Sequence, residues 1–169
     1  MRKAALKIQK GFTIIELVLV VGIIGVISTF GFVAIDQFTS SKDFESTTNN
    51  FVNMIYEAKS NTLSQVKLGG NCAATNLIGY KISVNTAVNP ISYTMSIVCG
   101  TDSETPSSWT TTAIKTDYLT TDASLDMVPT SSFMFETPNA LVSEEYTMNL
   151  SFGSLNKTIV VATAGAILQ

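Results

Sequence analysis

Residues 11–16 read Gly-Phe-Thr-Ile-Ile-Glu, and an apolar run begins inside them and continues to Ile35. Glu16 is the only charged residue between Phe12 and Ile35. As a helix, this run extends roughly 36 Å, which is enough to cross a hydrocarbon core of about 30 Å. A carboxylate on such a helix is costly unless another group neutralises it. The sequence therefore predicts a membrane-length helix over residues 12–35 in which Glu16 requires a partner.

The residues before this run carry only positive charge, at Arg2, Lys3, Lys7 and Lys10. Basic residues beside the first membrane span keep that end of a chain in the cytoplasm, so we expect the remainder to face outward. A secretory signal has a shorter apolar core that is followed by a cleavage site of small residues. We therefore expect the span to stay with the mature protein.

The basic leader, the Gly11-Phe12 junction, Glu16 and the aliphatic run together resemble the class III signal of type IV prepilins and pseudopilins. The resemblance covers about the first 60 residues. It implies that a prepilin peptidase removes residues 1–11 by cutting between Gly11 and Phe12, and then methylates the new amino terminus at Phe12. Glu16 becomes the fifth residue of the mature chain. The resemblance also implies a long helix packed on an antiparallel sheet.

One position departs from the family pattern, because Val33 stands where many members carry a proline that kinks the helix. Gly22, Gly25 and Gly31 are expected to loosen this stretch instead, since glycine in a helix costs up to about 1 kcal/mol relative to alanine. Small residues also let helices approach closely within a membrane or a fibre core.

The physical chemistry of Glu16 agrees with the resemblance. Removal of the leader would place the amine of Phe12 one helical turn, about 6 Å, from Glu16. An ammonium and a carboxylate attract strongly in low dielectric, and each relieves the desolvation of the other. The pair can form within one chain, or with the Phe12 amine of a neighbour, which would set the register of a polymer. The alternative is that Glu16 merely sits in the first turn, favoured by the helix dipole and nearby headgroups.

After Asp36 the pattern becomes amphipathic. One face carries Phe44, Phe51, Ile55, Ala58 and Val66, and polar residues lie between these positions. We expect residues 36–68 to form a helix that packs on the outer domain and ends at Gly69-Gly70. Residues 69–169 are expected to form that domain, an extracellular antiparallel β-sheet head, so the fold class is α+β.

Strand patterns occupy this last region. We expect strands over Leu77 to Val84, Ile91 to Val98, Ala113 to Leu119, Ser132 to Glu136, Tyr146 to Phe152 and Thr158 to Ala162, with a final strand reaching Leu168. Asn85 to Pro90 would join the first two as a hairpin, and Gly153 and Asn156 would mark a later turn. Residues 101–132 are rich in Ser, Thr and Asp, and we expect an exposed excursion there.

The chain has two cysteines, Cys72 and Cys99, both on the expected outer side. Two thiols in an exported domain predict one disulfide, which would stabilise the fold by roughly 3 to 4 kcal/mol. Two free cysteines or a metal site are the alternatives. A zinc site is disfavoured because the chain has no histidine and two thiolates alone are a poor ligand set.

The sequence offers little chemistry. Without histidine, the usual Ser-His and Cys-His nucleophile pairs cannot form, and no glycine loop for phosphate is present. The acidic stretches 101–104 and 117–126 are spaced loosely enough to suggest calcium, but neither follows the EF-hand pattern. Loss of the leader would leave six Lys and Arg against thirteen Asp and Glu, which argues against a nucleic-acid partner. We predict no enzyme activity, no cofactor and no metal.

The sequence therefore predicts a structural subunit of a type IV pilus-like filament, held in the cytoplasmic membrane as a precursor with its amino terminus inside, and later at the cell surface. The resemblance implies these partners: copies of itself, other pilins, a prepilin peptidase, and an assembly platform with its ATPase. A minor pilin or a type II secretion pseudopilin is an alternative. Another is a single-pass membrane protein whose outer domain binds a ligand or DNA and never polymerises.

Overall fold

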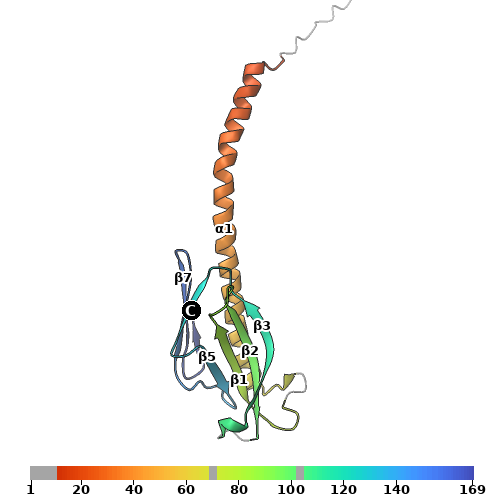
Figure 1. The fold of residues 1–169 in the computed structure, drawn as a ribbon, viewed down its shortest axis with the longest axis vertical. Coiled ribbons are helices and arrows are strands. Elements are labelled where there is room, and N and C mark those ends of the chain that lie inside the picture. The colour runs from red at the N-terminus through yellow and green to blue at the C-terminus, as the bar shows by residue number, and fades with distance from the viewer. Residues whose placement is uncertain (1–10, 69–71, 102–104) are drawn as a thin grey trace, which may run out of the picture. The chain divides into compact units, whose positions relative to one another are not determined.

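The structure, a computed structural model, describes residues 11–68, 72–101 and 105–169, without the side chains of residues 29–37. The basic leader over residues 1–10 and the expected helix terminator Gly69-Gly70 lie outside the described residues. The chain divides into two compact units, Met1–Ser40 and Ser41–Gln169. The expected α+β layout, a helix followed by antiparallel strands, is confirmed (Figure 1).

One long helix precedes the strands. The elements are α1 (Ile14–Leu63), β1 (Asn76–Asn85), β2 (Ser92–Gly100), a short 3-10 helix η2 (Pro106–Ser108), β3 (Thr110–Tyr118), β4 (Ser124–Val128), β5 (Ser132–Glu136), β6 (Tyr146–Phe152), β7 (Leu155–Val161) and β8 (Ile167–Leu168). β5 and β6 have the bounds that the sequence predicted, while β3 and β7 each begin three residues earlier. β4 was not predicted.

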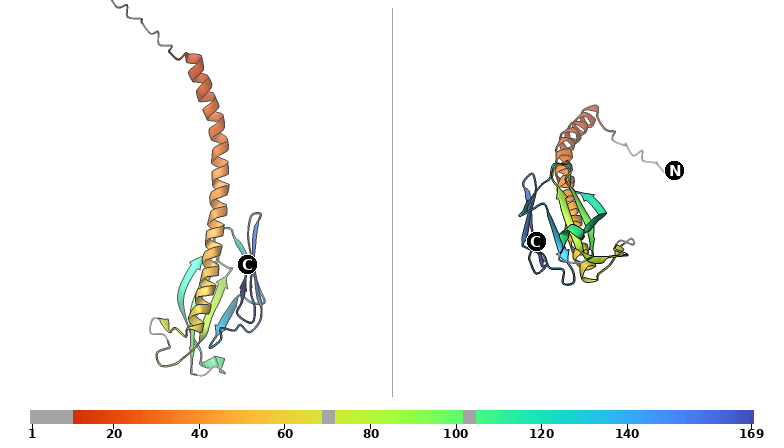
Figure 2. Two further views of the ribbon diagram at one scale, coloured as in Figure 1. Left: turned by 180° about the vertical axis from the view of Figure 1, so that it is seen from behind. Right: turned by 60° about the horizontal axis from the view of Figure 1, so that its bottom comes forward.

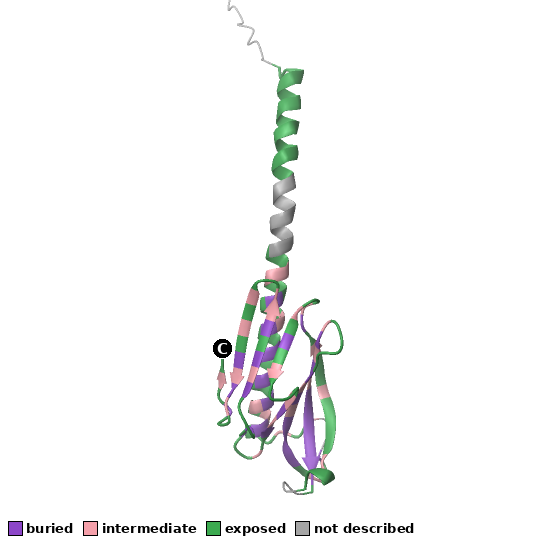
Figure 3. Ribbon diagram, turned by 60° about the vertical axis from the view of Figure 1, so that its left-hand side comes forward, coloured by how far each residue is buried: buried purple, intermediate pink, exposed green. Residues whose placement is uncertain are grey.

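Within the second unit, one face of α1 is buried and the other is exposed (Figure 3). Phe44, Phe51, Ile55 and Ala58 are all buried, as their helical spacing predicted. The opposite face is polar and carries an ion pair of 2.8 Å between Lys42 and Glu45. The hydrogen bond from Lys42 and its positive charge lower the pKa of the Glu45 carboxyl.

α1 ends at Leu63, several residues before the glycines that were expected to end it. The N–H of Val66 donates to the carbonyl of Asn61 (3.0 Å), and the N–H of Gln65 donates to that of Thr62 (3.1 Å). These two bonds form a Schellman motif, whose C′ residue requires a left-handed backbone. Gln65 takes this role with φ 49°, although glycine is the usual choice. The sequence therefore did not reveal where α1 ends, because the left-handed residue at its end is a glutamine and not a glycine.

The strands form two four-stranded sheets, whereas the sequence did not predict how the strands divide. The first sheet has the order β3-β2-β1-β5 and the second β4-β6-β7-β8. β1 and β2 form the predicted antiparallel hairpin, in which Leu77 lies opposite Cys99. At Gly79 the backbone of β5 approaches so closely that a Cβ would collide with the carbonyl oxygen of Phe135. This approach explains a glycine inside a strand.

The predicted turn between β6 and β7 is shorter than expected. Phe152 lies opposite Leu155, so only Gly153 and Ser154 form the turn, and Gly153 has the positive φ (58°) that such turns require. Asn156 pairs with Ser151 and is part of β7, so its assignment to the turn was wrong. The strand was missed at its start because its first residues alternate between exposed and half-buried positions.

The two sheets and residues 44–58 of α1 share one apolar core. Phe51 packs against Tyr93 of β2, and Phe44 stacks on Phe152 at the end of β6. Phe133 of β5 contacts Tyr146 of β6, which joins the sheets. Figure 2 shows the two sheets from further sides. Each large side chain that is fully buried here stabilises the unit by roughly 1.5–3 kcal/mol.

Candidate functional site

The segment before α1 has no regular secondary structure. Residues 11–13 are non-helical and exposed, and α1 begins at Ile14. Among the described residues, apart from Gly11 and its chain neighbours, no heavy atom lies within 4 Å of the position that a Cβ on Gly11 would take, and Phe12 is 78% exposed. The peptide bond between Gly11 and Phe12 therefore lies in an exposed, non-helical stretch of backbone.

Thr13 caps the helix. The backbone N–H of Glu16 lies 3.3 Å from the hydroxyl of Thr13 and 3.1 Å from its carbonyl, and the N–H of Leu17 donates to the same carbonyl at 3.2 Å. This is the bonding of an N-cap residue, which satisfies N–H groups that the first helical turn leaves without partners. Sequence reasoning missed this role. The signal was present in the spacing Thr-x-x-Glu, the pattern of a capping box.

Glu16 is the third residue of α1 and is exposed. Neither of the two ion pairs found among the described residues includes it. The first turn of a helix favours a negative charge because of the helix dipole, but this effect is screened in water. Within the described segments, the chain therefore presents this carboxylate on an apolar surface without a cation opposite it.

The surface around Glu16 is apolar on every side of the helix. Large apolar side chains are exposed at these positions: Phe12, Ile14, Ile15, Leu17, Val18, Leu19, Val20, Val21, Ile23, Ile24, Val26 and Ile27. A helix that is apolar all round is stable only when other apolar groups cover it. A single chain does not supply that cover to these residues, so the first turns of α1 require a partner or a lipid environment.

The predicted glycines lie on this surface. At Gly22 and Gly25, a Cβ would meet no atom of the described residues within 4 Å, apart from the chain neighbours and the backbone of the same helix. Both positions therefore leave room for another helix to approach the backbone. Gly31 belongs to residues 29–37, whose side-chain surroundings lie outside the described residues. The packing role of the three glycines stays a prediction.

In the segments of the chain that the structure describes, no helix is both long and apolar enough to cross a membrane.

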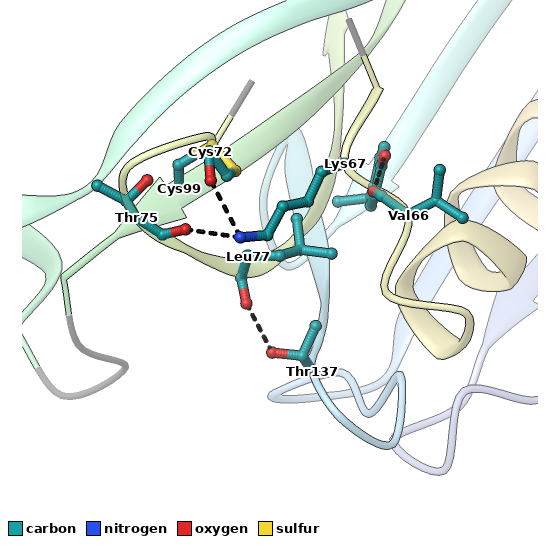
Figure 4. Close-up of a disulfide and its surroundings, with 8 residues drawn as sticks. Val66, Lys67, Cys72, Thr75, Leu77, Cys99 and Thr137 are labelled. Carbon is teal, nitrogen blue, oxygen red and sulfur yellow. Dashed lines mark hydrogen bonds between the residues drawn. A yellow bond between two sulfur atoms is a disulfide. The ribbon is translucent and has the colours of Figure 1, made fainter. Parts of the chain in front are cut away.

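The predicted disulfide between Cys72 and Cys99 is present (Figure 4). It joins the segment before β1 to the end of β2, and the amine of Lys67 donates to the carbonyls of Cys72 (3.0 Å) and Thr75 (2.8 Å). The hydroxyl of Tyr80 donates to the carbonyl of Val66 at 2.7 Å. The chain after α1 is thus fixed to the first sheet by a covalent bond and by hydrogen bonds. These contacts have a structural role.

The acidic stretches considered for calcium do not form a ligand cluster within the described ranges. No group of three or more Cys, Asp or Glu side chains there is placed to hold a metal ion. Residues 102–104, which belong to the first stretch, lie outside those ranges.

Comparison with known proteins bears on the first residues of the chain. Residues 6–32 match the family model of the prokaryotic N-terminal methylation motif. This range includes the Gly11-Phe12 junction and Glu16, so the resemblance drawn from these residues is confirmed there. No curated protein and no solved structure matches the chain.

Proposed function

We propose that this chain, whose N-terminal methylation motif is the class III signal of type IV pilins and pseudopilins, is a structural subunit of a type IV pilus-like filament. One observation carries the proposal: the first turns of α1 are apolar on all sides, with Glu16 as their single charge. A polymer of such helices would cover the apolar side chains with one another. The role is that of a building block and not of an enzyme.

The first step is removal of the leader. A prepilin peptidase would cut between Gly11 and Phe12, and the exposed, non-helical backbone there supports this, because the bond is accessible without unwinding α1. The cut leaves a methylated amine on Phe12. Thr13 remains in the mature chain, so its cap on the helix survives processing.

The second step is neutralisation of Glu16. Once the chain leaves the lipid headgroups, the carboxylate would enter the apolar centre of a fibre, where an unpaired charge is strongly unfavourable. The Phe12 amine of an adjoining subunit is a cation that every added chain supplies. Pairing would stop each new subunit at the axial position where its carboxylate meets that amine.

The remaining parts follow from this assembly. Residues 12–35 would anchor the precursor in the cytoplasmic membrane, with the basic leader inside, and would later form the fibre core. The two sheets would face outward, where an oxidising environment maintains the Cys72–Cys99 disulfide. The proposed partners are copies of this chain, other pilins, the peptidase, and the assembly platform with its ATPase. They are proposed from the motif.

Substitution of Glu16 tests the proposal. Glu16→Gln removes the charge at nearly constant size, and we expect normal cleavage but at least about a hundredfold loss of fibre, because breaking a buried charge pair costs roughly 3 kcal/mol or more. Glu45→Ala is the matched control, since Glu45 is an exposed glutamate of the same helix whose ion pair contributes little. Sheared surface fibres are quantified for each variant. A wild-type yield from Glu16→Gln would refute the polymer model.

Amino-terminal sequencing checks the processing step separately. The mature chain should begin at Phe12 with a methylated amine. A mature chain that still begins at Met1 would remove the processing claim, whatever the fibre yield.

A further inference from the structure

β3 (Thr110–Tyr118) is the longest strand at an open sheet edge. It is one of the two edge strands of the first sheet and lies beside β2 (Figures 1 and 2), and β5 is the other. β3 has nine residues without proline, whereas β5 has five and the edge strands of the second sheet have five and two. Seven residues of β3 are exposed, and Ile114 and Asp117 are half-buried. Such an edge is a template for pairing with another strand unless it is blocked.

The hydrogen bonds show which backbone groups of β3 face outward. The N–H of Leu119 donates to the carbonyl of Ile91 at 2.9 Å, so the backbone N–H of Leu119 faces the strand that follows Ile91, β2. In an antiparallel ladder this direction alternates, so Asp117 and Lys115 also face β2. Thr116 and Tyr118 therefore turn their N–H and C=O groups to the open side. The N–H of Tyr118 is consistent with this, because it meets only the carboxylate of Asp117, at 2.9 Å.

We propose that residues 115–117, which follow an irregularity of β3 at Ile114, pair antiparallel with the same residues of a second copy of this chain, about a two-fold axis at Thr116. Residues whose backbone N–H and C=O groups face outward in one copy must lie opposite such residues in the other copy. This condition restricts the possible registers. An axis at Lys115 would set lysine against lysine, and one at Asp117 would set aspartate against aspartate. Like charges directly opposite destabilise a sheet. The axis at Thr116 avoids both.

This register makes the pairs within residues 115–117 complementary. Lys115 lies opposite Asp117 of the second copy, and by symmetry this ion pair forms twice. Thr116 meets its own copy at the centre. Ile114 is left out of the pairing, because the register between β2 and β3 is irregular there and Ile114 packs against the core. Opposite charges and paired threonines are cross-strand combinations that stabilise sheets.

The contacts that the edge now makes are weak enough to exchange. Lys115 pairs with Glu57 at 3.4 Å, but both side chains are about half exposed, at 51% and 44%. Exposed pairs of this kind contribute little. Asp117 would release the N–H of Tyr118, which faces the open side of the sheet and would then be available to the second copy.

A two-fold contact reverses the direction of the second copy. It therefore cannot be the repeating contact of one polar fibre, whose subunits all point the same way. It would join the outer units of two separate fibres, or of two chains that have not assembled. The inference is independent of the fibre proposal, because it concerns only the surface of the second unit.

Cross-linking at the axis tests it. The full chain is dissolved in a large excess of detergent micelles over protein and oxidised mildly. Thr116→Cys should form a disulfide-linked dimer, since the two Cα atoms would lie about 5.5 Å apart, within the range of a disulfide. Thr111→Cys is the matched control on the same exposed strand, because this register separates its two copies by about 33 Å. Equal dimer yields from both variants, or none from Thr116→Cys, would overturn the proposal.

Exchange of charges tests the register. Lys115→Asp and Asp117→Lys should each weaken self-association by about tenfold, because each variant sets like charges opposite one another in both pairs. A mixture of the two variants should associate as the unchanged chain does, since every pair then joins an acid to a lysine. Association through α1 would not respond to these charges. Failure of the mixture to recover, with both variants still folded by their thermal unfolding curves, would overturn the register.

Discussion

Thr13 accepts the backbone N–H of Glu16 on both its hydroxyl (3.3 Å) and its carbonyl (3.1 Å). The residue that follows Phe12 thus fixes the first turn that carries the acid. If the chain is cut after Gly11 as proposed, the position of Glu16 relative to the new amino terminus would depend on this cap, since a frayed turn would let the carboxylate and the amine of Phe12 separate. The proposed charge pairing would then be coupled to helix capping at this end of the chain.

The cap can be removed without a change of shape. Thr13→Val replaces the hydroxyl by a methyl group, and loss of an N-cap costs about 1 kcal/mol of helix stability. Hydrogen exchange at the amides of Glu16 and Leu17 should become about fivefold faster in the detergent-solubilised chain. Thr13→Ser keeps the hydroxyl and should leave the rates near those of the unchanged chain. Equal exchange in all three proteins would show that Thr13 does not cap α1.

Replacing either of two buried tyrosines on neighbouring strands by phenylalanine should change the free energy of unfolding, but in opposite directions. The hydroxyl of Tyr80 donates to Val66, whereas that of Tyr93 has no hydrogen-bond partner within the described residues. Tyr80→Phe should lower the free energy of unfolding by about 1 kcal/mol, and Tyr93→Phe should raise it by about 1 kcal/mol, because a buried unsatisfied hydroxyl is unfavourable. Denaturant unfolding of the two variants measures this. Destabilisation by both would imply that Tyr93 has a partner.

Tyr93 also predicts how the stability of the fold changes at alkaline pH. Burial, and secondarily the negative charge of Asp117, raise the pKa of the Tyr93 hydroxyl. The folded state then holds this proton more tightly than the unfolded state, whose tyrosine pKa is about 10. The contribution of this raised pKa to the free energy of unfolding should be fully present below about pH 10 and should be lost as the pH rises above it. Tyr93→Phe should make this fall shallower, measured as the unfolding midpoint from pH 8 to 11. An unchanged slope would contradict the shift.

The end of α1 offers a stabilising substitution. Gln65 holds a left-handed backbone with φ 49° at the C′ position of the Schellman motif. Glycine adopts this conformation without strain, so Gln65→Gly should raise the free energy of unfolding by about 0.5–1 kcal/mol. Ser64→Gly, one residue earlier, should have no such benefit. Thermal unfolding compares the two, and a loss of stability in Gln65→Gly would contradict the assigned role.

Much of the fold could be predicted from residue patterns because its strands alternate cleanly. β5 and β6 carry buried residues at every second position, and their bounds matched. β4 was missed because only Leu125 of its five residues is buried, within a polar stretch. The division into two sheets was also not predicted, since a period of two identifies a strand but not its neighbours.

The roles of Gly11, Phe12 and Glu16 were predicted from the resemblance of the leader, the Gly-Phe junction and the aliphatic run to a known signal. The match over residues 6–32 supports the motif, and the roles of the single residues stay a prediction. The cap by Thr13 was missed, although its spacing was visible. The end of α1 could not be predicted, because Gln65 has no preference for the left-handed backbone that the surrounding hydrogen bonds impose on it.

A density map of the native fibre, at a resolution that shows side chains, tests the central claim most directly. The account predicts that the Glu16 carboxylate of each subunit lies within about 4 Å of the Phe12 amine of an adjoining subunit. It also predicts that the apolar side chains from Ile14 to Ile27 are covered by neighbouring helices. A Glu16 carboxylate that faces lipid or water, with no ammonium from any chain beside it, would contradict the account.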